Sequence, residues 1–162
     1  MEMVIVVAIV GILAALVVPS FSRSKELGDL RAATRKLMGT IQRARTLAAT
    51  GKNDNYPTWN PTDRVVHAGI LFAPDGYQLF VDRDRIRDGD EITIEVVDFD
   101  DSTASEYAPT VVVVAPPPAT EIRFAKNGTI VGGLDNTLIL RDTPSGIEQT
   151  VQLSLGGSAR LR

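Results

Sequence analysis

The chain has 162 residues, 17 lysines and arginines against 20 acidic residues, a net charge of −3, one histidine and no cysteine. This length allows one modest globular domain beside a separate segment, and the lack of cysteine excludes a disulfide framework, a thiolate metal site and a Cys/His dyad. The charge is unevenly distributed, because residues 23–52 carry eight basic and two acidic side chains, whereas residues 53–162 carry nine basic and seventeen acidic ones.

The chain opens on MEMVIVVAIVGILAALVVPSF, in which Glu2 precedes an apolar run from Met3 to Val18. As a helix this run is about 24 Å long, a little short of the roughly 30 Å hydrocarbon core of a bilayer. It lacks the basic flank of a secretory signal peptide and the polar stripe of a core helix in a soluble domain. Residues 1–21 are therefore predicted to form a membrane-inserted helix. Glu2 is then anomalous, because a carboxylate beside hydrocarbon is costly unless it lies among the headgroups.

After Pro19, apolar and small residues recur at alternating steps of three and four, which predicts an amphipathic helix over residues 22–52. Its buried stripe consists of Leu27, Leu30, Thr34, Leu37, Ile41, Ala44 and Ala48. Gly51 is a suitable residue for ending this helix, and Pro19 is expected to bend the helix that contains it. The two segments together would form one helix of about 70 Å. Its basic side chains either contact lipid or a filament interior, or form a solvated face.

Residues 53–162 contain short strand-like runs separated by turn residues. Hairpins are predicted at Pro74-Asp75-Gly76, at Asn127-Gly128 as a type I′ turn, and at Pro144-Ser145-Gly146. The run EITIEVVDF alternates, and TVVVVAPPPA ends at three prolines. No helical pattern lies between the strands, which argues against a Rossmann-like sheet. We expect an α+β fold, in which a long N-terminal helix with an apolar and an amphipathic half packs on an antiparallel β-sheet or sandwich head.

Few residues in the head favour catalysis or ligand binding. His67 lies at a predicted strand start, where a strand-edge histidine is the simpler interpretation than a catalytic base. Asp98, Asp100 and Asp101 offer carboxylates to a calcium ion, against the alternative of a solvated loop. Asn127 matches a glycosylation acceptor, but the hairpin explains it better. We expect no enzyme activity, no cofactor and no metal.

The stretch EMVIVVAIVGILAALVVPSF resembles the N-terminal segment of type IV pilins and type II secretion pseudopilins, with Glu2, Gly11 and Pro19 in register. The stem end QRARTLAATGK, the hairpin IRFAKNGTI and the Gly-rich basic tail are similar, more diffusely, to the GspH/FimT branch. The family's basic leader and its Phe-Thr-Leu-Ile segment do not stand before Glu2. A prepilin peptidase is therefore an expected partner only if a leader exists upstream.

The resemblance implies a non-enzymatic minor pseudopilin or pilin that assembles with other subunits into, or primes, a type II secretion pseudopilus or a type IV pilus. It implies that Glu2 pairs with the N-terminal ammonium of an adjacent subunit, and that Gly11 and Pro19 allow local unwinding and bending. It also implies a single pass through the bacterial inner membrane, with the head in the periplasm until assembly. The basic residues after the helix favour the opposite orientation, so the orientation follows from the resemblance alone.

Two other functions stay open at this point. The tail GGSARLR resembles the Gly-Arg-x-Arg tail of FimT-like minor pilins that bind DNA, with Arg160 and Arg162 matching and Arg141 and Lys126 as possible helpers. So few phosphate contacts would give weak, salt-sensitive binding, and the acidic head opposes it. A major structural pilin is the other alternative, although the cysteine-closed loop of many such subunits is lacking.

Overall fold

The computed structural model describes residues 2–51, 64–84, 91–99, 110–117, 119–131 and 137–162, and before residue 24 it describes side chains only at residues 6, 7 and 9–13. In these residues one helix, α1 (Glu2–Thr50), precedes nine strands. The strands are β1 (His67–Ala73), β2 (Gly76–Asp82), β3 (Ile92–Asp98), β4 (Val111–Ala115), β5 (Glu121–Ala125), β6 (Ile130–Val131), β7 (Thr137–Asp142), β8 (Glu148–Leu153) and β9 (Ala159–Leu161).

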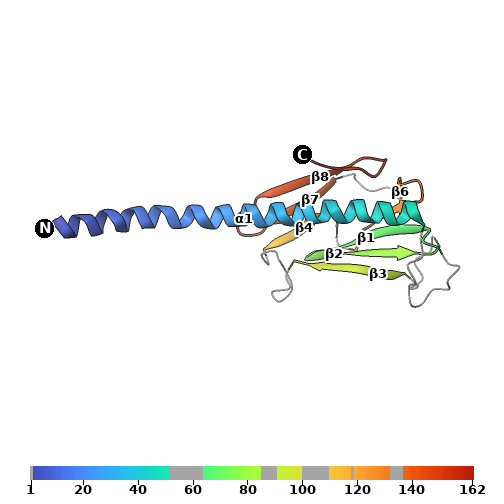
Figure 1. Cartoon of the computed structure of the whole chain (residues 1–162), viewed down its shortest axis with the longest axis horizontal. Coiled ribbons are helices and arrows are strands. Elements are labelled where there is room, and N and C mark those ends of the chain that lie inside the picture. Colours follow the sequence, from blue (N-terminus) through green and yellow to red (C-terminus); the bar gives the residue numbers. More distant parts are fainter. Residues whose placement is uncertain (1, 52–63, 85–90, 100–109, 118, 132–136) are drawn as a thin grey trace.

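Helix α1 is continuous from Glu2 to Thr50, and its first part projects beyond the strands (Figure 1). The ribbon shows no sharp kink, so the bend expected at Pro19 is wrong. The predicted stop at Gly51 is confirmed: its φ is +60°, and its N–H donates to the carbonyl oxygen of Leu47 at 3.2 Å. Glycine suits this position because a left-handed residue closes a helix end without a Cβ clash.

The prediction that residues 1–21 cross the bacterial inner membrane once, with the head in the periplasm, is wrong. In the described part of the chain, no helix is long and apolar enough to cross a membrane. A spanning helix needs about twenty predominantly apolar residues, and the apolar run from Met3 already ends at Val18.

The strands form two antiparallel sheets, one in the order β3-β2-β1-β5-β6 and the other in the order β4-β7-β8-β9. In Figure 1 β2 and β3 of the first sheet lie on one side of the second part of α1, and β8 of the second sheet lies on the other. The helix contacts β1, β2 and β5 of the first sheet and β4, β7, β8 and β9 of the second. The α+β class with an antiparallel head is thus confirmed. The sandwich is supported in part, because two sheets are present but the helix supplies much of their shared core.

The stripe predicted on α1 is the face that the head buries. Leu27 is half-buried, and every later member of the stripe is almost fully inaccessible to solvent. The later members are Leu30, Thr34, Leu37, Ile41, Ala44 and Ala48. Thr34 is accommodated because its hydroxyl donates to the carbonyl oxygen of Leu30 at 2.8 Å. Thr40 lies 3.3 Å from the hydroxyl of Tyr77, which links the helix to β2.

The three predicted hairpins are present, but the turn between β5 and β6 differs from its predicted type. A type I′ turn needs a positive φ at both central residues, and here Gly128 has a φ of +76° while Asn127 does not have a positive φ. The N–H of Gly128 donates to the carbonyl oxygen of Ala125 at 2.7 Å. A Cβ on Gly128 would lie 2.8 Å from Nε of Arg45, so the turn packs directly on the end of α1.

A buried ion pair joins β2 and β5 on the face of the first sheet that points away from α1. Arg123 donates from Nη1 to Asp82 at 2.9 Å and from Nε to Glu121 at 2.8 Å, and its guanidinium lies 5.6 Å from the centre of the Phe80 ring. Asp82 is fully buried and Arg123 is 8% exposed. Burial raises the pKa of Asp82 above its ordinary value of 3.8, and the Asp84 N–H and Arg123 only partly offset this.

We predict that Arg123→Met lowers the free energy of unfolding at pH 7 by about 3–5 kcal/mol, because it leaves the buried Asp82 carboxylate without its cation. Because the folded-state pKa of Asp82 is raised, ionisation of this carboxyl lowers stability as pH rises through that pKa. The difference in unfolding free energy between the variant and the parent chain should therefore narrow as pH falls toward about 4.5. Urea unfolding at the two pH values measures this. Arg141→Met, which breaks an exposed pair with Glu148, is the matched control and should cost less than about 1 kcal/mol. A deficit of equal size at both pH values would contradict the argument.

Asp142 closes the hairpin between β7 and β8. Burial alone would raise its pKa, but Ser145 donates to Oδ2 of Asp142 from Oγ at 2.5 Å and from its N–H at 3.0 Å, and the pKa of Asp142 is lowered below 3.8. Hydrogen bonds to a carboxylate favour its charged form, and this is the reason for the direction. The turn is completed by Gly146, whose φ is +67°.

Ser145→Ala should lower the free energy of unfolding at pH 7 by about 1.5–3 kcal/mol, because one hydrogen bond to a buried carboxylate is lost. A lowered folded-state pKa gives stability that is present above 3.8 and is lost as pH falls through the folded-state value, so the variant should lose structure at a higher pH than the parent chain. Acid titration followed by circular dichroism measures the midpoint. Ser154→Ala removes a hydroxyl that pairs with neutral Ser158, and its midpoint should not move.

Candidate functional site

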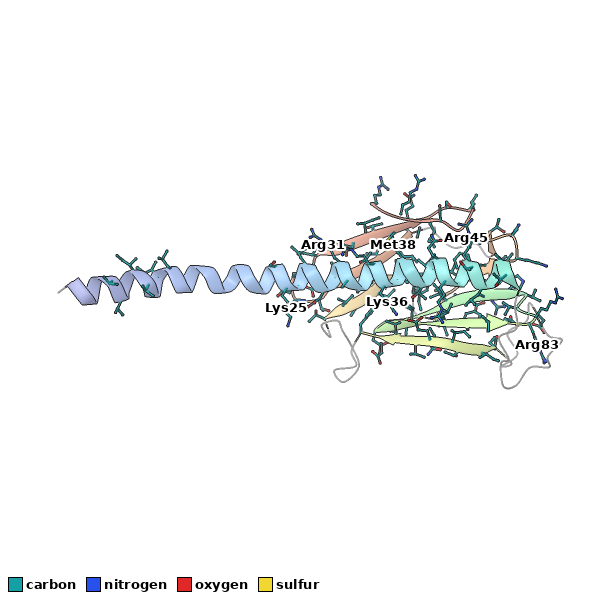
Figure 2. The ribbon with its side chains drawn as sticks, viewed as in Figure 1. Lys25, Arg31, Lys36, Met38, Arg45 and Arg83 are labelled. Atoms are coloured by element: carbon teal, nitrogen blue, oxygen red, sulfur yellow. The ribbon has the colours of Figure 1, made fainter. Side chains whose placement is uncertain are left out.

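The first candidate surface is the projecting segment, defined here as residues 6–13 of α1. All its described large side chains are apolar, and each is more than half exposed. They are Val6, Val7, Ile9, Val10, Ile12 and Leu13. At 100° per residue these positions fall around most of the helix circumference rather than on one stripe. In Figure 2 their side chains stand out on both sides of the ribbon.

The residues predicted for subunit assembly lie on or beside this segment. Gly11 is exposed, and a Cβ built there would meet nothing within 4 Å. Glu2 is the first residue of α1 and Pro19 lies within it, but their side chains are outside the described residues. The ion pair expected for Glu2 therefore stays a prediction.

The second candidate surface is a groove between α1 and β3. Glu95 of β3 accepts from Nζ of Lys36 at 2.6 Å and from Nη1 of Arg43 at 2.8 Å. Lys36 and Arg31 lie on opposite sides of α1, so only some of the basic side chains of this helix face β3 (Figure 2). The basic side chains of α1 thus divide into one group that binds the head through Glu95 and another that points away from β3.

Glu95 and Arg123 are the polar residues that sequence reasoning missed. In the pairing of β2 with β3, Glu95 lies opposite the fully buried Leu79 and therefore on the face that carries α1, beside a bulge between Leu79 and Phe80. The only signal was the charge imbalance, because an excess of cations on the stem needs carboxylates on the head. Arg123 had no such signal, since its main partner Asp82 is 41 residues away in sequence.

The third candidate surface is the C-terminal strand. Arg160 and Arg162 are exposed on or just after β9, and the N–H of Arg162 donates to the carbonyl oxygen of Thr150 at 3.0 Å. Lys126 is exposed in the turn between β5 and β6. Arg141 belongs to β7, and its guanidinium is held by Glu148. The four residues predicted to contact DNA thus lie in three places on the head, and one of them, Arg141, is paired with Glu148.

The described residues offer little for metal or acid–base chemistry. Among them, no three His, Asp or Glu side chains are placed to hold a metal ion. His67 is buried at the start of β1, opposite Asp82 in the strand register. Of the carboxylates considered for calcium, Asp98 ends β3, whereas Asp100 and Asp101 lie outside the described residues. Asn127 is exposed, and its Oδ1 accepts from the Thr129 N–H at 3.1 Å, which fits a structural role in the turn.

Comparisons of the chain with models of protein families, with curated proteins and with solved structures found no match.

Proposed function

We propose that the chain is a non-enzymatic filament subunit that assembles through its N-terminal helix, as the resemblance to minor pseudopilins and pilins implies. The filament would be a type II secretion pseudopilus or a type IV pilus. The observation that carries the proposal is the projecting segment, whose large apolar side chains are exposed in the single chain. Apolar surface of this extent is characteristic of a surface that is covered by another molecule.

The distribution of these side chains favours a bundle of several helices over a dimer. A two-helix seam buries one stripe of each helix, and a helix that is apolar all round needs neighbours on several sides. Full burial of a Val, Leu or Ile side chain contributes about 1.5–3 kcal/mol. The exposed positions from Val6 to Leu13 therefore supply a large driving force, provided that each helix is surrounded by others.

The shape of the chain fits repeated addition of subunits. The head is attached only to the later part of α1, so it leaves the projecting segment accessible to neighbours (Figure 1). If the segment of one subunit packs against a different part of the next, the contact does not close on itself and generates a helical filament. The resemblance assigns the choice of register to Glu2, since an unpaired carboxylate inside an apolar bundle is strongly penalised.

DNA binding through the C-terminal arginines is the weaker proposal. It has two exposed arginines, Arg160 and Arg162, on a head in which acidic residues outnumber basic ones. Arg141, a possible third contact, is already paired with Glu148. Two phosphate contacts would leave an affinity that is lost at moderate salt.

Leu13→Asp should abolish filament assembly, because it places a charge in the apolar bundle. Pelleting by ultracentrifugation and negative-stain electron microscopy of the full chain measure assembly, and thermal unfolding of the head should be unchanged. Leu155→Asp is the matched control, since Leu155 is 75% exposed in a turn of the head and Leu13 is 56% exposed. Equal loss of assembly in both variants would show that the projecting segment has no special role.

Glu2→Ala should leave the head folded and prevent the subunit from joining the filament. The reason is that the variant has no carboxylate to pair with the ammonium group of its neighbour. Co-purification of the variant with pili or pseudopili, compared with the parent chain, measures incorporation. Incorporation at the level of the parent chain would remove the role that the resemblance gives to Glu2.

A further inference from the structure

The groove between α1 and β3 has room for a ligand. Its volume is about 500 Å³, and among the described residues one wall consists of α1 and the other of Glu95 on β3. The residues of α1 that line it are Ala32, Arg35, Lys36, Gly39, Thr40 and Arg43. A Cβ on Gly39 would meet nothing within 4 Å, so the middle of the helical wall is open.

The charge of this lining is unbalanced. It contains three cationic side chains, Arg35, Lys36 and Arg43, and a single carboxylate, that of Glu95. The side chains of Lys36 and Arg43 are 43% and 54% exposed in their ion pairs with Glu95. Ion pairs that are this exposed are weak and are readily exchanged for another carboxylate. The groove therefore favours an occupant that carries several negative charges.

The strand beside the groove has an open edge. β3 pairs with β2 on one side, and among the described strands it has no neighbour on the other side. Its sequence, ITIEVVD, contains neither proline nor lysine, and Val96 is 60% exposed, so the bulge and the inward-facing Glu95 are the only common edge-protecting features among its described residues. At the edge of a sheet, an extended peptide can pair with backbone N–H and C=O groups.

From the basic groove and the adjacent open edge we infer a docking site for an extended acidic segment of a partner protein. The segment adds alongside β3, and its alternate carboxylates point toward Arg35, Lys36 and Arg43 on α1. A polypeptide fits better than a nucleic acid or a free phosphate, because only a polypeptide can continue the backbone ladder of β3. Side chains of an added strand alternate between the two faces, so glutamate at every second position meets the groove. This inference does not depend on the proposed filament.

The test uses the full chain and a fluorescein-labelled peptide of alternating glutamate and valine, with capped ends. Fluorescence anisotropy at about 50 mM salt should show saturable binding, which weakens as salt screens the charges. The double variant Arg35→Ala/Arg43→Ala should bind at least about tenfold more weakly. Arg31→Ala is the matched control, because Arg31 lies on the other side of α1 from Lys36 (Figure 2), and its affinity should equal that of the parent chain.

Two further measurements separate strand addition from simple charge attraction. Gly39→Leu fills the groove without changing its charge and should weaken binding, whereas Gly28→Leu, at another open helical glycine, should not. The same peptide N-methylated at every second residue cannot complete the ladder and should not bind. Equal binding of the methylated peptide, or unchanged affinity in Gly39→Leu, would overturn the inference. Binding of a short oligonucleotide in place of the peptide would overturn the inference in favour of a nucleic acid. Loss of self-association in Arg35→Ala/Arg43→Ala, without any binding of the peptide to the parent chain, would overturn it in favour of a second copy of the chain.

Discussion

The head depends on one buried interface, the contact between the later half of α1 and the two sheets. Leu30, Leu37 and Ile41 are completely buried in it, and each such side chain contributes about 1.5–3 kcal/mol relative to exposure. The two sheets are separate hydrogen-bonded units, and α1 touches most strands of both. Without the helix, the inner face of each sheet would be exposed to water. The helix is therefore part of the core of the head as well as the projecting rod.

The parts of this fold that could be predicted are those that local pattern controls. The three-four spacing from Leu27 to Ala48 specified the buried stripe of the helix, because only that spacing keeps one face toward the head. The turns at Pro74-Asp75-Gly76 and Pro144-Ser145-Gly146 were found from residue types that favour a reversal. In each case the residues that determine the structure lie within a few positions of one another, so the local sequence was enough to predict it.

What could not be predicted depends on contacts between distant residues. Strict alternation along ITIEVVD would place Ile92 and Glu95 on opposite faces of the strand, but the extra residue in β3 brings both of them opposite buried residues of β2. The buried pair of Asp82 and Arg123 likewise forms only when β1 has brought β2 and β5 into one sheet. The turn at Asn127 departed from type I′ in a region where Arg45 packs on Gly128. For the candidate site, the apolar run was evident from the sequence, but the groove was not, because its two walls, α1 and Glu95 on β3, are far apart in the sequence.

The orientation of the buried stripe has a mechanical consequence. The stripe runs along the axis of α1, so a force that pulls on the free end of the helix acts parallel to the whole row of contacts. All of them then bear the load together, whereas a force across the helix would separate them one after another. Many weak dispersion contacts that yield together resist far more than their individual strengths suggest. A head attached in this way is expected to stay folded when a pulling force is applied to the projecting end of α1.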